Sequence, residues 1–88
     1  MTMADRIRDK LATLAPQALT ITDDSSKHAG HAGAKPGGET HFSVAVVSGR
    51  FTGMSRVERY RLVHELLDAE LKEGVHALSL ALKTPEEV

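Results

Sequence analysis

Histidines are the residues of this chain best suited to chemistry, because 5 of its 88 residues are histidine and none is cysteine. Neutral imidazole is a common ligand for iron and other transition metals. His28 and His31 lie close together in a glycine-rich stretch, and His76 precedes an apolar alternating segment. The lack of cysteine excludes disulfides, zinc–thiolate sites and a cysteinyl iron–sulfur site made by this chain alone. Imidazole is therefore the ligand of this chain best suited to iron.

Each histidine also has an ordinary interpretation, and spacing alone leaves both interpretations open. His76 has the strand parity of the apolar residues that follow it, which suits a half-buried histidine with a satisfied ring. His28 and His31 suit solvated positions in a loop. His41 is expected to be structural, and His64 is expected to be a solvated or interface residue.

The composition indicates one globular domain over residues 1–88, with 41% apolar residues. The 11 basic and 12 acidic residues leave a net charge near zero, so no overall positive field attracts nucleic acid.

No apolar run approaches the roughly 20 residues that span a membrane, and no secretory signal opens the chain. A cytoplasmic protein without a membrane partner is therefore expected. An enzyme is not expected, because no nucleophile–base pair, phosphate-binding loop or carboxylate pair stands out.

Apolar periodicity predicts the order helix, strand, strand, helix, strand. The first helix is capped by Thr2 and ends at Pro16. Alternation predicts strands over residues 19–22, 42–47 and 75–82. A helix between the second and third strands implies that these two strands run parallel.

The second helical segment, whole or broken, begins at Ser55 with Glu58 in capping-box spacing and stops at Gly74. Thr84 and Pro85 predict a last helical turn at the end of the chain. The predicted buried stripe of the second helical segment consists of Val57, Tyr60, Val63, Leu67 and Leu71, joined by Leu66.

Residues 23–40 are expected to form a long flexible loop, because they are rich in glycine and a connection longer than about 12–15 residues is usually functional or disordered. Within it, residues 30–33 read GxxG, the motif with which KH domains clamp a nucleic-acid backbone. In KH domains this motif lies between two helices, so its occurrence here is interpreted as coincidence. No GxxG occurs between Arg50 and Gly74.

A set of short motifs, found in order along nearly the whole chain, resembles the BolA family. The set consists of Asp24-Ser25, His28, Gly38-Glu39-Thr40-His41-Phe42, Val46-Val47-Ser48, Arg50-Phe51-Thr52-Gly53, Arg59 with Arg61, and Val75-His76-Ala77-Leu78. No fragment is decisive by itself, but the ordered set is specific. The chain departs from the family at Tyr60, where many members carry histidine, and in its longer loop with the additional His31.

The resemblance implies an α+β fold like the class II KH domain, with the order α-β-β-α-α-β. The three-stranded mixed sheet would carry its helices on one face and lack the GxxG loop. The resemblance also implies that the chain, a monomer alone, forms a heterodimer with a monothiol glutaredoxin around a shared [2Fe–2S] cluster. In such complexes the glutaredoxin and glutathione supply thiolates. The matching metal ligands here are His76 and His28, with His31 as a substitute for His28, and the isolated chain is expected to hold no cofactor.

The function implied is that of an adaptor in iron–sulfur cluster trafficking or in iron and redox sensing. The alternative that the resemblance also permits is a DNA-binding transcriptional regulator. A local basic cluster is formed in the sequence by Arg50, Arg56, Arg59 and Arg61. Three interpretations of this cluster stay open: a solvated face partly ion-paired with Glu58 and Glu65, a docking surface for glutaredoxin, and weak contact with DNA phosphates. The near-neutral charge and the missing GxxG count against DNA binding.

Overall fold

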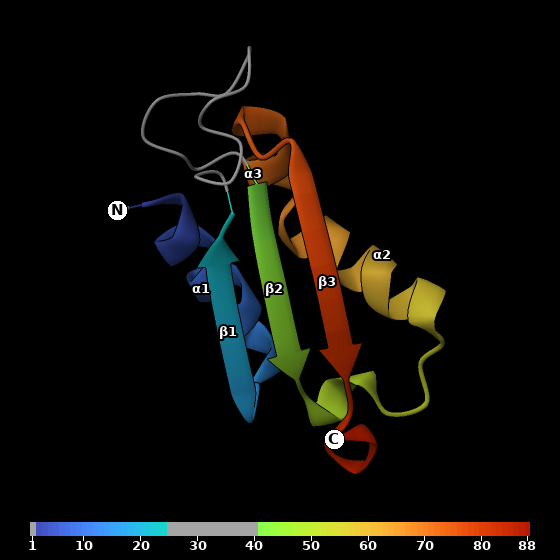
Figure 1. Ribbon diagram of the computed structural model, residues 1–88. Helices are drawn as coiled ribbons and strands as arrows, with labels where there is room; N and C mark the ends of the chain where they lie inside the picture. Colours follow the sequence, from blue (N-terminus) through green and yellow to red (C-terminus); the bar gives the residue numbers. More distant parts are fainter. Residues whose placement is uncertain (1, 25–40) are drawn as a thin grey trace.

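Three β-strands form one mixed sheet in the order β1-β2-β3 (Figure 1). The computed structural model describes residues 2–24 and 41–88. Its strands are β1 (Ala18–Asp23), β2 (His41–Val47) and β3 (Ala77–Lys83). β1 and β2 pair antiparallel, whereas β2 and β3 pair parallel with His41 opposite Ala77. The predicted mixed sheet and its strand directions are confirmed.

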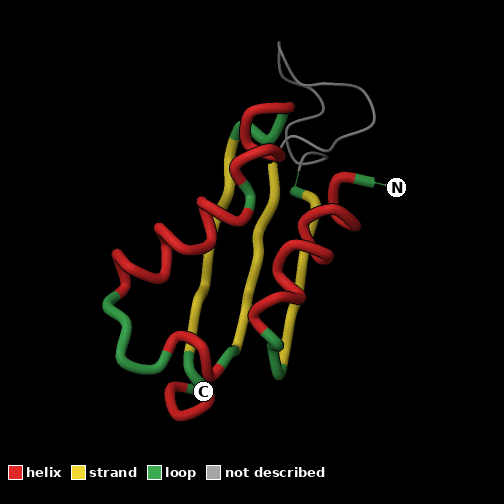
Figure 2. The backbone as a smooth tube through the Cα atoms, turned by 180° about the vertical axis from the view of Figure 1, so that it is seen from behind, coloured by secondary structure: helices red, strands yellow, loops and turns green. Residues whose placement is uncertain are grey.

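The helices cover one face of this sheet and leave the other face open (Figures 1 and 2). They are α1 (Met3–Leu11), α2 (Arg56–Leu66) and α3 (Asp68–Glu73). Short 3-10 turns occupy Ala12–Leu14, Gly49–Phe51 and Pro85–Glu87. The predicted α+β fold with the order α-β-β-α-α-β is confirmed, while its likeness to KH domains stays a prediction.

Three helical starts carry the same reciprocal cap. In each, a Ser or Thr hydroxyl and a carboxylate three positions later accept hydrogen bonds from each other's backbone N–H. The pairs are Thr2 with Asp5, Ser55 with Glu58, and Thr84 with Glu87. These bonds satisfy N–H groups that lack a partner within the helix. The starts predicted at Thr2 and Ser55 are therefore confirmed.

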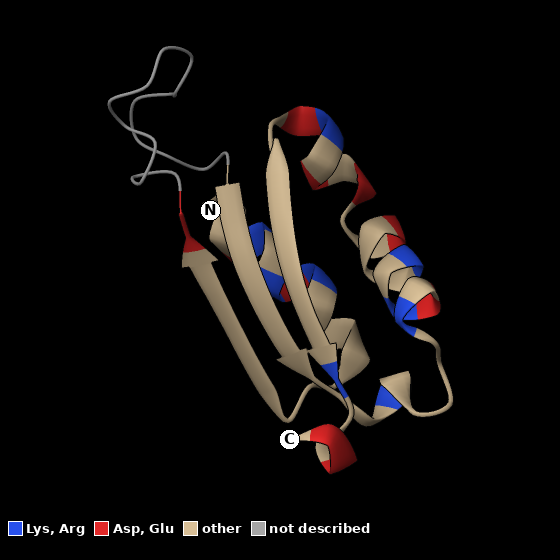
Figure 3. Cartoon of the chain, turned by 45° about the vertical axis from the view of Figure 1, so that its right-hand side comes forward, with Lys and Arg blue, Asp and Glu red and all other residues tan. Residues whose placement is uncertain are grey.

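The alternation along the strands sends apolar side chains toward the helices. Phe42, Val44 and Val46 of β2 are buried, and every second residue of β3 from Leu78 to Leu82 is half-buried. The charged residues lie mainly on the helices, and the strands carry a charge only near their ends (Figure 3). The core is therefore a single, mainly aliphatic layer between the sheet and the helices that also contains Phe42 and Phe51.

The buried face of the second helical segment differs from the prediction. Val63 and Leu67 are buried as expected, but Val57 is 57% exposed and Tyr60 is 42% exposed. Arg59 takes the buried place on the first turns of α2, at 8% exposure. Arg59, Val63 and Leu67 follow one another at four-residue intervals and therefore share a helix face. The prediction was wrong for Val57 and Tyr60, because it assigned the face by hydrophobicity alone.

Several predicted boundaries shift by a few residues. The first helix ends at Leu11 and continues as a 3-10 turn, and β3 begins at Ala77 rather than Val75. Asp23, predicted as the first residue of the loop over 23–40, belongs to β1. Residues 25–40 of that predicted loop lie outside the described residues. In the part of the chain that the structure describes, no helix is long and apolar enough to cross a membrane.

Candidate metal centre

His76 lies in the short connection between α3 and β3, and its side chain is exposed. The preceding residue, Val75, is buried in the core, and its N–H donates to the carbonyl of Glu70 at 3.2 Å. The following residue, Ala77, begins β3. No hydrogen bond or ion pair joins the imidazole of His76 to another described residue. The backbone at His76 is thus held on both sides while its side chain stays open to solvent.

A buried carboxylate holds the helix that precedes His76. Glu70 of α3 is 1% exposed and accepts hydrogen bonds from Arg6 at 2.9 Å and Lys10 at 3.2 Å, both on α1. Arg6 also bonds Glu73, and this hydrogen bond holds the pKa of the Glu73 carboxyl below its ordinary value. This clamp could not be predicted from the sequence, because its partners are some 60 residues apart and no local pattern joins them.

The two described residues that flank the segment 25–40, Asp24 and His41, meet at the end of the sheet where β3 begins, directly after His76. His41 begins β2 and lies opposite the first residue of β3. The backbone N–H of Asp24 donates to the His41 carbonyl at 2.7 Å. The predicted loop ligands His28 and His31 fall between Asp24 and His41 in the sequence and lie outside the described residues.

The potential metal ligands at this end of the sheet suit a metal site shared with another molecule better than a site made by this chain alone. Among the described residues, no group of three or more His, Asp or Glu side chains could hold a metal ion. Imidazole suits iron, and two histidines can replace two thiolates on one iron of a [2Fe–2S] centre. The exposed His76 imidazole therefore fits one corner of a cluster whose remaining ligands come from elsewhere.

His64 is placed differently from His76. It is exposed on α2, and its Nδ1 lies 2.7 Å from the backbone carbonyl oxygen of Tyr60 in the preceding turn. Because a carbonyl oxygen only accepts, this nitrogen carries the proton. The exposure agrees with the expected solvated residue, whereas the structural role expected for His41 stays a prediction.

The four arginines of the predicted basic cluster do not share one environment. Arg50, Arg56 and Arg61 are exposed, but Arg59 is buried. The Arg59 guanidinium donates to the carbonyls of Met54 and Leu82, at 3.1 and 3.0 Å, and lies 5.8 Å from the centre of the Phe51 ring. Arg59 is therefore a structural residue that joins α2 to the end of β3.

The ion-pair partner of Arg59 is Glu87 of the last turn, at 2.6 Å, rather than Glu58 or Glu65. This hydrogen bond, with a second one from the backbone of Thr84, lowers the pKa of the Glu87 carboxyl from its ordinary value of 4.5 to about 2. The last turn is predicted by the sequence, but this ion pair is not, because no local pattern relates Glu87 to α2.

The low pKa of Glu87 predicts an acid-dependent loss of stability. A carboxyl with a depressed folded-state pKa stabilises the fold above pH 4.5, and this contribution disappears as pH falls through about 2. Glu87→Gln should therefore be less stable than the wild type at pH 5, and the difference should shrink toward pH 2. Thermal unfolding at several pH values checks this, with the neighbouring exposed Glu86→Gln as the control. A constant difference between Glu87→Gln and the wild type across this range would contradict the prediction.

The family model described as BolA-like protein matches residues 11–87, which is most of the chain. The chain belongs to the BolA-like protein family. The family that the sequence motifs resemble is thereby confirmed.

Two curated relatives show how this BolA-like chain compares with longer proteins. Protein BOLA1, chloroplastic, from Arabidopsis thaliana is 53% identical over 87 residues, covering 96% of this chain and 54% of that protein. BolA-like protein 1 from Mus musculus is 52% identical over 80 residues, covering 90% of this chain and 56% of that protein. The chain thus spans about half the length of these two relatives.

A solved structure supports the same assignment for the fold. The BolA domain of SufE1 from Arabidopsis thaliana matches with a TM-score of 0.87 and 48% identity, covering 100% of this chain and 98% of that one. The name of the plant BOLA1 protein places that relative in the chloroplast. The cytoplasmic location expected for this BolA-like chain is not confirmed and stays a prediction.

Proposed function

We propose that this BolA-like protein is an adaptor that binds a monothiol glutaredoxin and shares a [2Fe–2S] cluster with it. The chain contributes His76 and His28, with His31 as a substitute for His28, and the glutaredoxin and glutathione contribute thiolates. One observation carries the proposal. Asp24 and His41, which flank the segment with both loop histidines, meet at the end of the sheet where His76 is exposed.

The local structure around His76 supports a ligand role. Its side chain is exposed and has no described bonding partner, so no existing hydrogen bond must break before it binds a metal. Its backbone is held by the buried Val75 and by β3, so little backbone entropy is lost when the imidazole binds a metal. In the proposed role the chain binds the glutaredoxin and presents histidine ligands to the cluster, and this needs no catalytic residue. It serves iron–sulfur cluster trafficking or the sensing of iron and redox state.

DNA binding, the alternative, has less support. Of the arginines in the predicted basic cluster, Arg59 is buried and paired with Glu87. The junction of α2 and α3, at residues 66–68, contains no glycine and therefore no GxxG. Titration with duplex DNA at two salt concentrations tests this alternative, because phosphate contacts give an affinity that falls steeply with salt.

The direct test of the proposal is to mix the chain with a cluster-loaded monothiol glutaredoxin and glutathione. The visible spectrum should shift from the all-thiolate form to that of a histidine-ligated [2Fe–2S] centre, and the reduction potential should rise, as in Rieske-type sites. The mixed complex should be acid-sensitive, because imidazole must be neutral to bind a metal. The chain alone should bind cluster poorly, since it has no thiolate. An unchanged glutaredoxin spectrum after mixing would contradict the proposal.

A further inference from the structure

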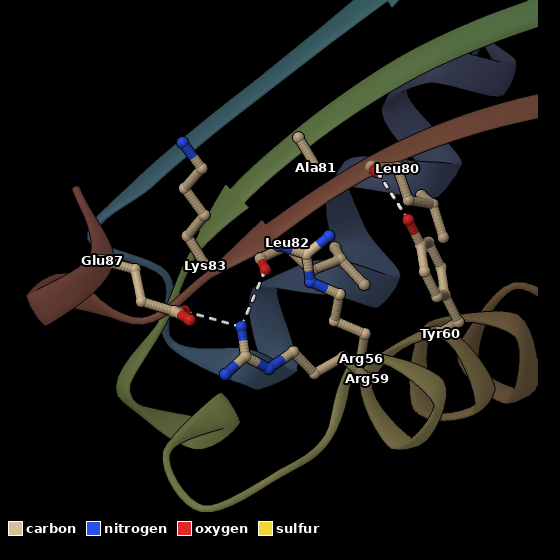
Figure 4. A pocket seen from close by; sticks show the side chains of 8 residues that line it. All are labelled: Arg56, Arg59, Tyr60, Leu80, Ala81, Leu82, Lys83 and Glu87. Atoms are coloured by element: carbon tan, nitrogen blue, oxygen red, sulfur yellow. Dashed lines mark hydrogen bonds and ion pairs between the residues drawn. The ribbon is translucent and has the colours of Figure 1, made fainter.

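A groove of about 450 Å³ lies between α2 and the last residues of β3 (Figure 4). Tyr60 and Arg59 reach into it from α2, and Leu80 and Leu82 belong to the strand beside it. A strand rises about 3.3 Å per residue, so the far end of β3 is ~20 Å from His76. The groove and the candidate metal centre therefore lie at opposite ends of the same strand.

The outer edge of β3 offers hydrogen-bond donors to this groove. The carbonyl of Leu80 accepts from the Tyr60 hydroxyl at 3.3 Å, and the carbonyl of Leu82 accepts from Arg59 at 3.0 Å. The N–H and C=O of one strand residue point to the same side, so the N–H groups of Leu80 and Leu82 also point away from β2. β3 is an edge strand of the described sheet. The outer carbonyls of Leu80 and Leu82 are thus occupied, while the N–H groups of the same two residues face the groove.

The charges of the groove also favour a ligand with negatively charged acceptors. Arg56 is exposed in the groove wall and forms no ion pair with a described residue, and the same holds for Lys83 at the rim. Glu87 already holds a carboxylate in the groove, where it accepts from Arg59 at 2.6 Å and from the backbone N–H of Thr84 at 2.7 Å. The groove therefore binds one carboxylate of its own chain, and its cationic Arg56 and Lys83 side chains remain available to a second carboxylate.

We infer that this groove docks an acidic, extended segment of a partner protein. The carboxylates of the segment bind Arg56, and its backbone carbonyls accept from the outer N–H groups of Leu80 and Leu82. Peptides that lie along a sheet edge gain main-chain hydrogen bonds, and bonds between guanidinium and carboxylate are stronger than neutral ones. Tyr60 and Arg59 occupy the outer carbonyls, so the segment is recognised through its acceptors only. This docking is independent of the metal-ligand role at His76, and both partners can bind at once.

A nucleic-acid strand suits the groove less well. Grooves for single strands combine several cations with aromatic platforms on which bases stack. Tyr60 is the single aromatic residue in this groove, and its hydroxyl is tied to the Leu80 carbonyl. The arrangement therefore favours carboxylates carried by a peptide.

Fluorescence anisotropy of a labelled, short oligoglutamate peptide tests the inference with the full chain at low ionic strength. Binding should be saturable, and Arg56→Glu should weaken it by about tenfold, which is the loss of roughly one charge-assisted contact. Arg61→Glu is the matched control, because it makes the same charge change at an exposed position of the same helix outside the groove. Arg61→Glu should change the affinity for the peptide by less than about twofold, because it alters only the net charge of the chain. Circular dichroism should show that both variants fold.

Nuclear magnetic resonance locates the bound peptide. The amide signals of Leu80 and Leu82 should shift on titration, while that of Ala77 at the other end of β3 should not. Absence of saturable binding, or equal weakening by both variants, would overturn the inference. Tighter binding of a single-stranded oligothymidylate, with the same loss in Arg56→Glu, would also overturn it and assign the groove to nucleic acid.

Discussion

Replacement of Glu70 by alanine is expected to lower the free energy of unfolding by about 3 kcal/mol, within the range for breaking a buried ion pair. The carboxylate is 1% exposed and bridges Arg6 and Lys10, so its removal leaves a cavity, deprives Lys10 of its ion pair and leaves Arg6 with Glu73 alone. Both cations keep partial contact with water, at 30% and 45% side-chain exposure, which places the loss at the lower end of that range. Urea unfolding at neutral pH measures the effect.

Glu65→Ala is the matched control for this prediction. Glu65 is exposed on α2, and its side chain has no described bonding partner. Its removal should change the free energy of unfolding by no more than about 0.5 kcal/mol, as is usual for surface positions. Equal effects of Glu70→Ala and Glu65→Ala would show that the clamp between α1 and α3 does not stabilise the fold.

The features that the sequence predicted correctly depend on neighbours in the chain. The cap of Thr2 with Asp5 needs only a three-residue spacing, and the alternation of Phe42, Val44 and Val46 needs only a buried face. The physical cause of each pattern lies within a few neighbouring residues of the chain. The order and direction of the strands followed from these local patterns together with the rule for crossover connections.

The features that the sequence missed depend on distant partners. In the sequence, Arg59 belongs to a basic cluster and is expected at the surface. In the fold its hydrogen-bond acceptors are Leu82 and Glu87, which lie more than 20 residues later in the chain. Glu70 reads as an exposed carboxylate until α1 brings two cations over it. Periodicity weighs hydrophobicity along one element and so cannot detect a buried charge paired across elements.

Residue patterns alone could predict the candidate metal centre only in part. Spacing left His76 open between a ligand and an ordinary strand residue, and the resemblance to the BolA family supplied the ligand interpretation. The structure adds that His76 is exposed and that Asp24 and His41 meet beside it. The ligand roles of His28 and His31 stay predictions.

Variants of the loop histidines should separate the two candidates for the second ligand. His28→Ala should weaken the mixed-cluster spectrum formed with a glutaredoxin, and His31→Ala alone should leave it nearly intact. If His31 substitutes for His28, the double variant should lose the spectrum that His28→Ala retains. Retention of the full spectrum in the double variant would show that neither histidine is a ligand.

His76→Ala tests most directly whether His76 ligates the shared cluster. His76 is exposed and without a described partner, so its removal should leave the far-ultraviolet circular dichroism and the melting temperature nearly unchanged. His64→Ala, a change of the same residue type at an exposed position of α2, serves as the control. The measurement is the visible spectrum of each variant mixed with a cluster-loaded monothiol glutaredoxin and glutathione. We expect His76→Ala to abolish the histidine-ligated spectrum and His64→Ala to preserve it, whereas an unchanged mixed-cluster spectrum in His76→Ala would show that His76 is not a ligand.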